Sequence, residues 1–235
     1  MRLVKLLANL GYGSRKEMQA AIRNGWVTDK DGNPIKADSK LAHEDILFDD
    51  EPLDPPEGSV ILLNKPLGYT CSMKDRGRLV FDLLPARYRV RKPALSFVGR
   101  LDKDTTGLLL FTDDGKLLHQ IISPKADVAK VYEVELDRPM TGGEADQFAS
   151  GEMMLENDTS PLKPAELEVL SETTARLTLH EGRYHQVRRM FAATGNHVTK
   201  LHRAQLGGLT LDGVEEGQWK LLGTADIDRI FGDSA

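Results

Sequence analysis

The feature that most constrains the fold is residues 49–58, DDEPLDPPEG, which carry three prolines and no hydrophobic periodicity. Proline fixes φ and lacks a backbone N–H, so such a run continues neither a helix nor a central strand. We interpret it as an acidic, proline-rich linker. The chain of 235 residues is therefore expected to fold as a small unit over residues 1–58 and a larger unit over residues 59–235.

The small unit is predicted to begin with two helices. Leucines at positions 3, 6, 7 and 10 recur with the spacing of one buried helix face. Ser14 and Glu17 have the spacing of a capping box, which starts a second helix that ends at Gly25. Asp31-Gly32 predicts a turn between short β segments.

The larger unit is predicted to be α+β with a largely antiparallel sheet. Short helices are expected at 144–151 and 185–195. Strand patterns occur at 60–66, 95–102, 108–115, 131–136, 165–170 and 175–180, of which the last two alternate cleanly.

Composition excludes several classes of protein. With 40% hydrophobic and 29% charged residues, the chain has enough apolar material for a core. No run approaches the roughly 18 apolar residues of a membrane span, and no signal-peptide cleavage pattern is found. Cys71 is the single cysteine, which excludes a disulfide framework and a multi-cysteine zinc site. We expect a cytoplasmic protein with no membrane partner.

The net charge of −5 hides an uneven distribution. Basic residues concentrate in residues 1–28, 74–103 and 181–203, whereas residues 41–58 and 131–180 are strongly acidic. Three basic blocks that folded onto one face would favour a nucleic-acid partner. The alternative is an ordinary solvated surface.

Residues 97–107, FVGRLDKDTTG, carry the most informative motif. A strand over 97–102 would place Arg100 and Asp102 on one face near its end. In isolation, the pair also fits a surface ion pair beside a turn. The D-x-D-x-T pattern of residues 102–106 matches aspartyl-phosphate phosphatases, but these need a parallel βαβ sheet and further carboxylates for Mg²⁺. Residues 104–107 resemble one half of an aspartic protease site, and no second copy exists.

Two further segments carry candidate site residues. Alternation places Tyr132 on the apolar face of its strand, either in the core or lining a pocket where its ring stacks on a planar ligand. The second segment is the predicted helix over residues 185–195, on which His185 and Arg188 lie one turn apart and could face the same site. Arg188 and Arg189 diverge by about 100°, so only one of them is expected to point inward. The spacing of the histidines fits no common zinc site.

Four motifs together resemble the pseudouridine synthases of the RsuA type, along essentially the whole chain. They are LNKP with Gly68-Tyr69 at 63–69, GRLDKDTTG at 99–107, KVY at 130–132 and GRYHQVRRMF at 182–191. Residues 1–48 resemble the small RNA-binding domain named after ribosomal small-subunit protein four. The resemblance implies a fold in which that domain precedes a mainly antiparallel pseudouridine synthase catalytic domain.

The resemblance also implies an activity, the isomerisation of one uridine to pseudouridine in ribosomal RNA after base flipping, without a cofactor or metal. Details of residues 153–164 and 191–211 favour small-subunit over large-subunit RNA. The alternative from another class is a non-catalytic RNA-binding factor for ribosome assembly. The expected partner is ribosomal RNA or a partly assembled subunit, and the expected oligomeric state is a monomer.

The site residues are carried over from the resemblance motif by motif. Asp102 is the expected catalytic carboxylate, kept charged by an ion pair with Arg188, while Tyr132 stacks on the flipped base and Arg100 fills the vacated space. The residues expected to bind substrate are Arg100, Lys65, Arg183, His185 and Gln186. Those expected to bind RNA phosphates are Arg2, Lys5, Arg15, Lys16 and Arg23.

Overall fold

The computed structural model describes residues 3–123 and 125–232. The N-terminal unit contains α1 (Leu3–Leu10), α2 (Arg15–Arg23), a 3-10 helix η1 (His43–Asp45) and three short strands, β1 (Val27–Asp29), β2 (Ile46–Phe48) and β3 (Glu51–Pro52). The strands form one antiparallel sheet in the order β1-β2-β3. The predicted capping box is confirmed, because Ser14 Oγ accepts from the Glu17 N–H and Glu17 accepts from the Ser14 N–H. A separate cluster of buried side chains, including Leu7, Ile22 and Val27, forms the core of this unit.

The segment expected to be a linker is held more firmly than its prolines suggest. Glu51–Pro52 forms the edge strand β3, so this part of the segment interpreted as a linker belongs to the sheet of the N-terminal unit. Asp54 is buried and forms an ion pair with Arg87 of the larger unit. The carbonyls of Pro55 and Pro56 accept from Arg91 Nη2 at 2.8 and 3.2 Å. Proline removes a backbone donor but keeps its acceptor, and these carbonyls attach the segment to the larger unit.

A nine-stranded sheet forms the centre of the larger unit, with the path β12-β4-β6-β10-β7-β9-β8 and with β5 and β11 beside β6 and β10. Its strands are β4 (Val60–Lys65), β5 (Ser96–Val98), β6 (Thr106–Thr112), β7 (Lys130–Leu136), β8 (Glu166–Val169), β9 (Thr174–Leu179), β10 (Val198–Leu206), β11 (Leu209–Thr210) and β12 (Trp219–Leu222). The pairing of β6 with β10 is parallel, and the other pairings are antiparallel. The mixed, mainly sheet fold confirms the predicted α+β class.

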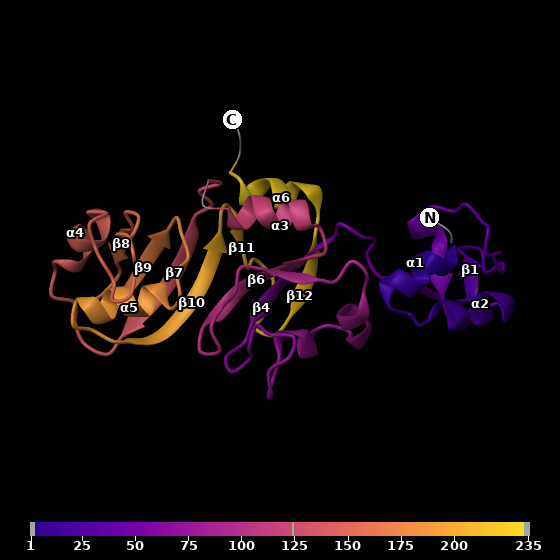
Figure 1. Cartoon of the computed structure of the whole chain (residues 1–235), viewed down its shortest axis with the longest axis horizontal. Coiled ribbons are helices and arrows are strands. Elements are labelled where there is room, and N and C mark those ends of the chain that lie inside the picture. Colours follow the sequence, from indigo (N-terminus) through magenta and orange to yellow (C-terminus); the bar gives the residue numbers. More distant parts are fainter. Residues whose placement is uncertain (1–2, 124, 233–235) are drawn as a thin grey trace.

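The helices cover both faces of this sheet (Figure 1). They are η2 (Val80–Leu83), η3 (Ala86–Val90), α3 (Gly115–Ile122), α4 (Glu144–Ala149), α5 (Gln186–Ala193) and α6 (Thr224–Ile230). Figure 1 shows α3 and α6 together above the middle of the sheet, α4 and α5 at the β8–β9 end, and the N-terminal unit at the opposite end. None of the described helices has the length and hydropathy to cross a membrane.

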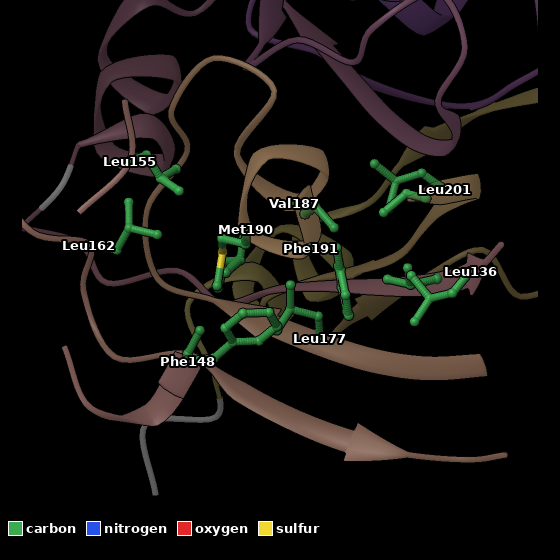
Figure 2. Close-up of a cluster of buried hydrophobic side chains, with 13 residues drawn as sticks. Leu136, Phe148, Leu155, Leu162, Leu177, Val187, Met190, Phe191 and Leu201 are labelled. Carbon is green, nitrogen blue, oxygen red and sulfur yellow. The ribbon is translucent and has the colours of Figure 1, made fainter. Parts of the chain in front are cut away.

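Alternation along the strands divides the larger core into three clusters. Val60 and Leu62 of β4 pack with α3 and α6 on one face, whereas Ile61 and Leu63 pack with η2 and η3 on the other. A third cluster joins β7, β9, α4 and α5, with Phe148, Leu177, Met190 and Phe191 at its centre (Figure 2). Tyr132 contacts both the third cluster and the cluster of η2 and η3, so these two lie on the same face of the sheet.

The segment around Asp102 differs from its predicted strand. β5 ends at Val98, and Gly99 has φ +71°, a left-handed conformation that ends the extended backbone. Residues 99–105 form a turn that leads into β6. Arg100 and Asp102 therefore lie on a loop, where their side chains are not constrained to alternate between two sheet faces.

Gly107 provides a test of the β6–β10 contact. A Cβ added at Gly107 would lie 2.3 Å from the Arg203 carbonyl oxygen, whereas one added at Gly77 would meet nothing within 4 Å, although φ is +105° and +104° respectively. Because the two glycines have nearly the same φ, comparing them separates the cost of backbone strain from the cost of the close approach. We expect Gly77→Ala to cost about 1–3 kcal/mol and Gly107→Ala at least about 2 kcal/mol more. Urea unfolding measures both, and equal losses would contradict the importance of this contact.

Candidate active site

Two of the predicted site residues, Lys65 and Tyr132, lie in one row across the sheet. Strand register pairs Lys65 with Gly107, Gly107 with Arg203, Arg203 with Tyr132 and Tyr132 with Leu177. Directly paired residues of neighbouring strands share a face, and strands are spaced by about 4.8 Å. The row therefore places the half-buried Tyr132 ring close to the turn of residues 99–105, which leads into β6 beside Gly107.

Lys65 lies under this turn with no exposed surface. Its ammonium group donates to the carbonyl oxygens of Thr105 at 2.7 Å, Pro66 at 3.2 Å and Lys103 at 3.4 Å. Burial lowers the pKa of Lys65, because desolvation disfavours the charged form. All three donors of the Lys65 ammonium are taken by backbone carbonyls in this geometry, and the expected contact of Lys65 with substrate stays a prediction. Lys65 thereby determines the shape of the turn.

Asp102 projects from the turn beside His185. The side chain of Asp102 is 36% exposed, and its Oδ1 lies 3.4 Å from His185 Nε2. His185 precedes α5 in a left-handed conformation with φ +48°. The Tyr184 ring stacks on the imidazole with centroids 3.9 Å apart and an interplanar angle of 15°. An accessible carboxylate thus lies next to an aromatic pair.

Arg188 faces the same turn but pairs with a different carboxylate. Its Nη2 lies 3.0 Å from Asp104 Oδ2 and donates to the Asp104 carbonyl at 3.0 Å, while its Nη1 donates to the Val198 carbonyl at 2.8 Å. The expected ion pair with Asp102 is absent among the described contacts. Arg188 lies one turn further along α5 than His185, so its guanidinium reaches Asp104 and His185 reaches Asp102. His185 and Arg188 thus both contact the turn of residues 99–105, through different carboxylates.

Arg183 and Gln186 hold the loop before α5 in place. Arg183 forms ion pairs with Asp158 at 2.9 Å and Glu181 at 3.1 Å, and the buried Gln186 donates to Glu181 at 3.0 Å. Arg189 points away from Asp104 and pairs with Asp158 at 2.8 Å. The Arg189 guanidinium, followed by that of Arg183, holds the pKa of the Asp158 carboxyl below its usual value. Arg183 and Gln186 are thus engaged in contacts within the protein, and their expected contacts with substrate stay predictions.

Arg100 and the N-terminal cations are more exposed than the other predicted site residues. Arg100 is exposed, and within the described part of the chain its guanidinium has no hydrogen-bond or ion-pair partner. The same holds for the side chains of Lys5, Arg15, Lys16 and Arg23. Arg2, also predicted to bind RNA, lies outside the described residues. The phosphate-binding role of these residues stays a prediction.

A groove of about 630 Å³ in the N-terminal unit brings three of its cations together. Lys16 and Arg23 from α2 line one side, and Lys36 lines the other. Ile22 and Ile35 are buried among its lining residues and give it an apolar floor. Sequence reasoning missed Lys36, because only the folded chain places the segment after Pro34 opposite α2.

The C-terminal basic block is largely paired with acidic side chains. Within it, Arg183 and Arg189 pair with Asp158, Arg188 pairs with Asp104, Lys200 pairs with Glu135, and Arg203 is buried. Arg203 Nε donates to the Leu108 carbonyl at 2.8 Å. Of the two alternatives left open for residues 181–203, a positive face and an ordinary solvated surface, these ion pairs favour the second.

The opposite face of the sheet carries a second hollow, which is lined by other residues. A hollow of about 390 Å³ there is lined by Glu133, Arg176, His202 and neighbouring residues. Alternation along β7 places Glu133 and Tyr132 on opposite faces, so this hollow is not part of the site around Asp102. Across the described residues, no group of three or more His, Cys, Asp or Glu side chains could hold a metal ion.

The chain is similar to known proteins over nearly its full length. It is 43% identical to ribosomal small subunit pseudouridine synthase A of Escherichia coli (strain K12), covering 98% of this chain and 100% of that protein. The protein of the same name from Haemophilus influenzae is 41% identical and is covered to 99%. A solved structure described as a crystal structure of pseudouridylate synthase has a TM-score of 0.68 and 38% identity, with 98% of this chain and 99% of that chain covered.

A sequence model of the family described as RNA pseudouridylate synthase matches residues 59–193. That range contains the turn with Asp102, the strand with Tyr132 and the α5 residues that face them. Together with relatives above 40% identity over 98% of the chain, the match shows that this protein belongs to the RNA pseudouridylate synthase family.

Proposed function

We propose that this enzyme isomerises one uridine to pseudouridine in small-subunit ribosomal RNA, with Asp102 as the catalytic carboxylate. The observation that carries the substrate assignment is the full-length similarity to enzymes named for the ribosomal small subunit. The geometry supports the role of Asp102, which is an accessible carboxylate on a turn close to Tyr132. We further propose that the enzyme acts in the cytoplasm, as a monomer, on ribosomal RNA or a partly assembled subunit.

The reaction rearranges bonds within one nucleotide. The C1′–N1 bond breaks, the base turns, and a C1′–C5 bond forms. C5 loses a proton and N1 gains one, so substrate and product have the same atoms and no electrons are transferred to another molecule. A carboxylate at the sugar–base junction is the group that this chemistry requires, and the resemblance of GRLD to the family motif assigns it to Asp102.

The target base has to leave its stack to reach Asp102, which costs a few kcal/mol. Stacking on an aromatic ring returns about 1–3 kcal/mol per base. We assign this role to Tyr132, whose half-buried ring packs against two core clusters and keeps an exposed part. Arg100 is exposed on the same turn as Asp102 and is assigned to the space that the base leaves.

Two cations position the turn without contacting the base. Lys65 gathers the carbonyls of Lys103 and Thr105 from below, and Arg188 holds Asp104 from the side of α5. Both act on the residues directly after Asp102. Because misplacing a reacting group by about 1 Å can cost 10²-fold in rate, we assign Lys65 and Arg188 as positioning residues.

The N-terminal groove is assigned to RNA. Its rim carries Lys16, Arg23 and Lys36, and no acidic residue lines it. Cations at such a rim bind phosphates, and the apolar floor accommodates the face of an unpaired base. This assignment extends the predicted RNA-binding role of α2 to Lys36.

The first experiment is carbodiimide-adduct primer extension across ribosomal RNA from cells that lack this gene, complemented with wild type or Asp102→Asn. We expect one stop in small-subunit RNA that returns with wild type and not with Asp102→Asn, because the amide removes the charge while keeping the shape. A stop in large-subunit RNA would contradict the substrate assignment. Stops that are identical in all strains with folded protein would favour the non-catalytic assembly factor.

Lys65→Met tests the positioning role. Methionine keeps an unbranched apolar side chain only one atom shorter than lysine, but it removes the donors to the three carbonyls. We expect kcat to fall at least about tenfold, as for displaced catalytic groups, while KM changes little because Lys65 does not reach the RNA. Lys200→Met is the control, since Lys200 is an exposed lysine paired with Glu135. A change confined to KM would contradict the positioning role.

The groove is tested by the salt dependence of RNA binding. Replacing Lys16, Arg23 and Lys36 together by Ala removes three phosphate contacts, which should make the negative slope of log K against log salt shallower by about 2 for single-stranded RNA. Filter binding of a small-subunit RNA fragment measures the slope, with Lys200→Ala as the matched exposed control. An unchanged slope would mean that the RNA phosphates bind outside the groove.

A further inference from the structure

Tyr184 is the most exposed of the large hydrophobic side chains that the structure describes, at 74%. It directly precedes His185, whose Nε2 lies 3.4 Å from Asp102 Oδ1. The ring thus lies at the rim of the site, outside the core. Neither the chemistry at Asp102 nor the stacking role assigned to Tyr132 uses it.

The Tyr184 ring has one occupied face and one open face. The imidazole of His185 covers the first face, with centroids 3.9 Å apart and planes 15° from parallel. Because the residue is 74% exposed, the second face is open to solvent. A planar ligand that stacked there would extend a stack of rings that starts beside Asp102.

The ring is also fixed before any ligand arrives. Arg189 Nη1 donates to the Tyr184 carbonyl at 3.3 Å, and Gln186 Oε1 accepts from the Arg183 N–H at 2.9 Å. His185 fixes the orientation of the ring by stacking on it. Little conformational freedom is left to lose on binding, and such preorganisation favours affinity.

The nucleotides next to the target uridine are covalently attached to it and must pass the rim of the site. Every base has a π face, so an exposed aromatic ring at this rim fits an unpaired base of any identity. Arg100 and Lys103 are exposed on the nearby turn and are suited to the phosphates of the same strand.

We propose that Tyr184, backed by His185, is a stacking platform for the base adjacent to the target uridine. The proposal rests on the proposed function and deepens it. The platform selects a target whose neighbour is unpaired, as in a loop or at a helix end, because a base held in a continuous duplex cannot stack on the ring. It also replaces part of the stacking that the neighbour loses when the uridine flips out.

The test uses a small-subunit RNA fragment that contains the uridine found by primer extension, either intact or with an abasic nucleotide on the 5′ or the 3′ side of it. The full-length variants are Tyr184→Ala and Tyr184→Phe, with Phe231→Ala as the control for loss of an exposed aromatic ring at 45% exposure. Conversion gives kcat and KM, and filter binding gives Kd for the same fragments.

On intact RNA we expect Tyr184→Ala to raise KM and Kd about tenfold, the effect of losing one base–aromatic stack, with kcat within about twofold. Tyr184→Phe and Phe231→Ala should match wild type. On RNA that is abasic at one neighbour, wild type and Tyr184→Ala should become equal, because the base that stacks is missing.

Two outcomes would overturn the platform: a Tyr184→Ala effect that persists unchanged on both abasic fragments, or one that appears in kcat with Kd unaltered. Either would mean that the ring only supports His185. Failure of wild type to convert the intact fragment concerns the proposed function instead. The Kd values then still decide the platform, since stacking of the neighbour does not require turnover.

Discussion

The structure depends on the close approach of β6 and β10 at Gly107 and Arg203. This short parallel pairing joins the half of the sheet that contains β4 and β12 to the half that contains β7, β8 and β9. A side chain at residue 107 would collide with the backbone of residue 203, so glycine is what permits this close pairing, which we call the seam of the sheet. The turn with Asp102 enters the sheet at this seam, and Tyr132 is paired with Arg203 on the next strand. The turn with Asp102 and the strand with Tyr132 therefore lie together because the β6–β10 pairing joins the two halves of the sheet.

The charges around the seam follow a common pattern. The cations here donate largely to backbone carbonyls: Lys65 to those of Pro66, Lys103 and Thr105, Arg203 Nε to that of Leu108, and Arg188 Nη1 to that of Val198. The carboxylate that Arg188 uses is that of Asp104. A buried cation needs acceptors, and carbonyls supply them without consuming a carboxylate. Asp102 thereby stays accessible in a cation-rich site within a protein of net charge −5.

The N-terminal unit is attached to this site by more than chain continuity. Asp54 pairs with Arg87, and Arg91 holds two proline carbonyls of the connecting segment. Arg87 also lies over the Tyr12 ring, 5.1 Å from its centroid. These contacts limit the freedom of the segment, and they restrict the distance between the cationic groove and the turn with Asp102.

The sequence by itself determined the local structure and the family. The capping box of α2, the alternation of β7 and β9 and the four ordered motifs each depend on neighbouring residues, so they could be read without the fold. Tertiary structure alone decided which carboxylate Arg188 meets, that Lys65 is buried, that the strand before Asp102 ends at Val98, and that the C-terminal basic block pairs with acidic residues distant in sequence. These outcomes depend on contacts between residues tens of positions apart. Strand register and helix placement set such contacts, and a pattern of neighbouring residues does not contain them.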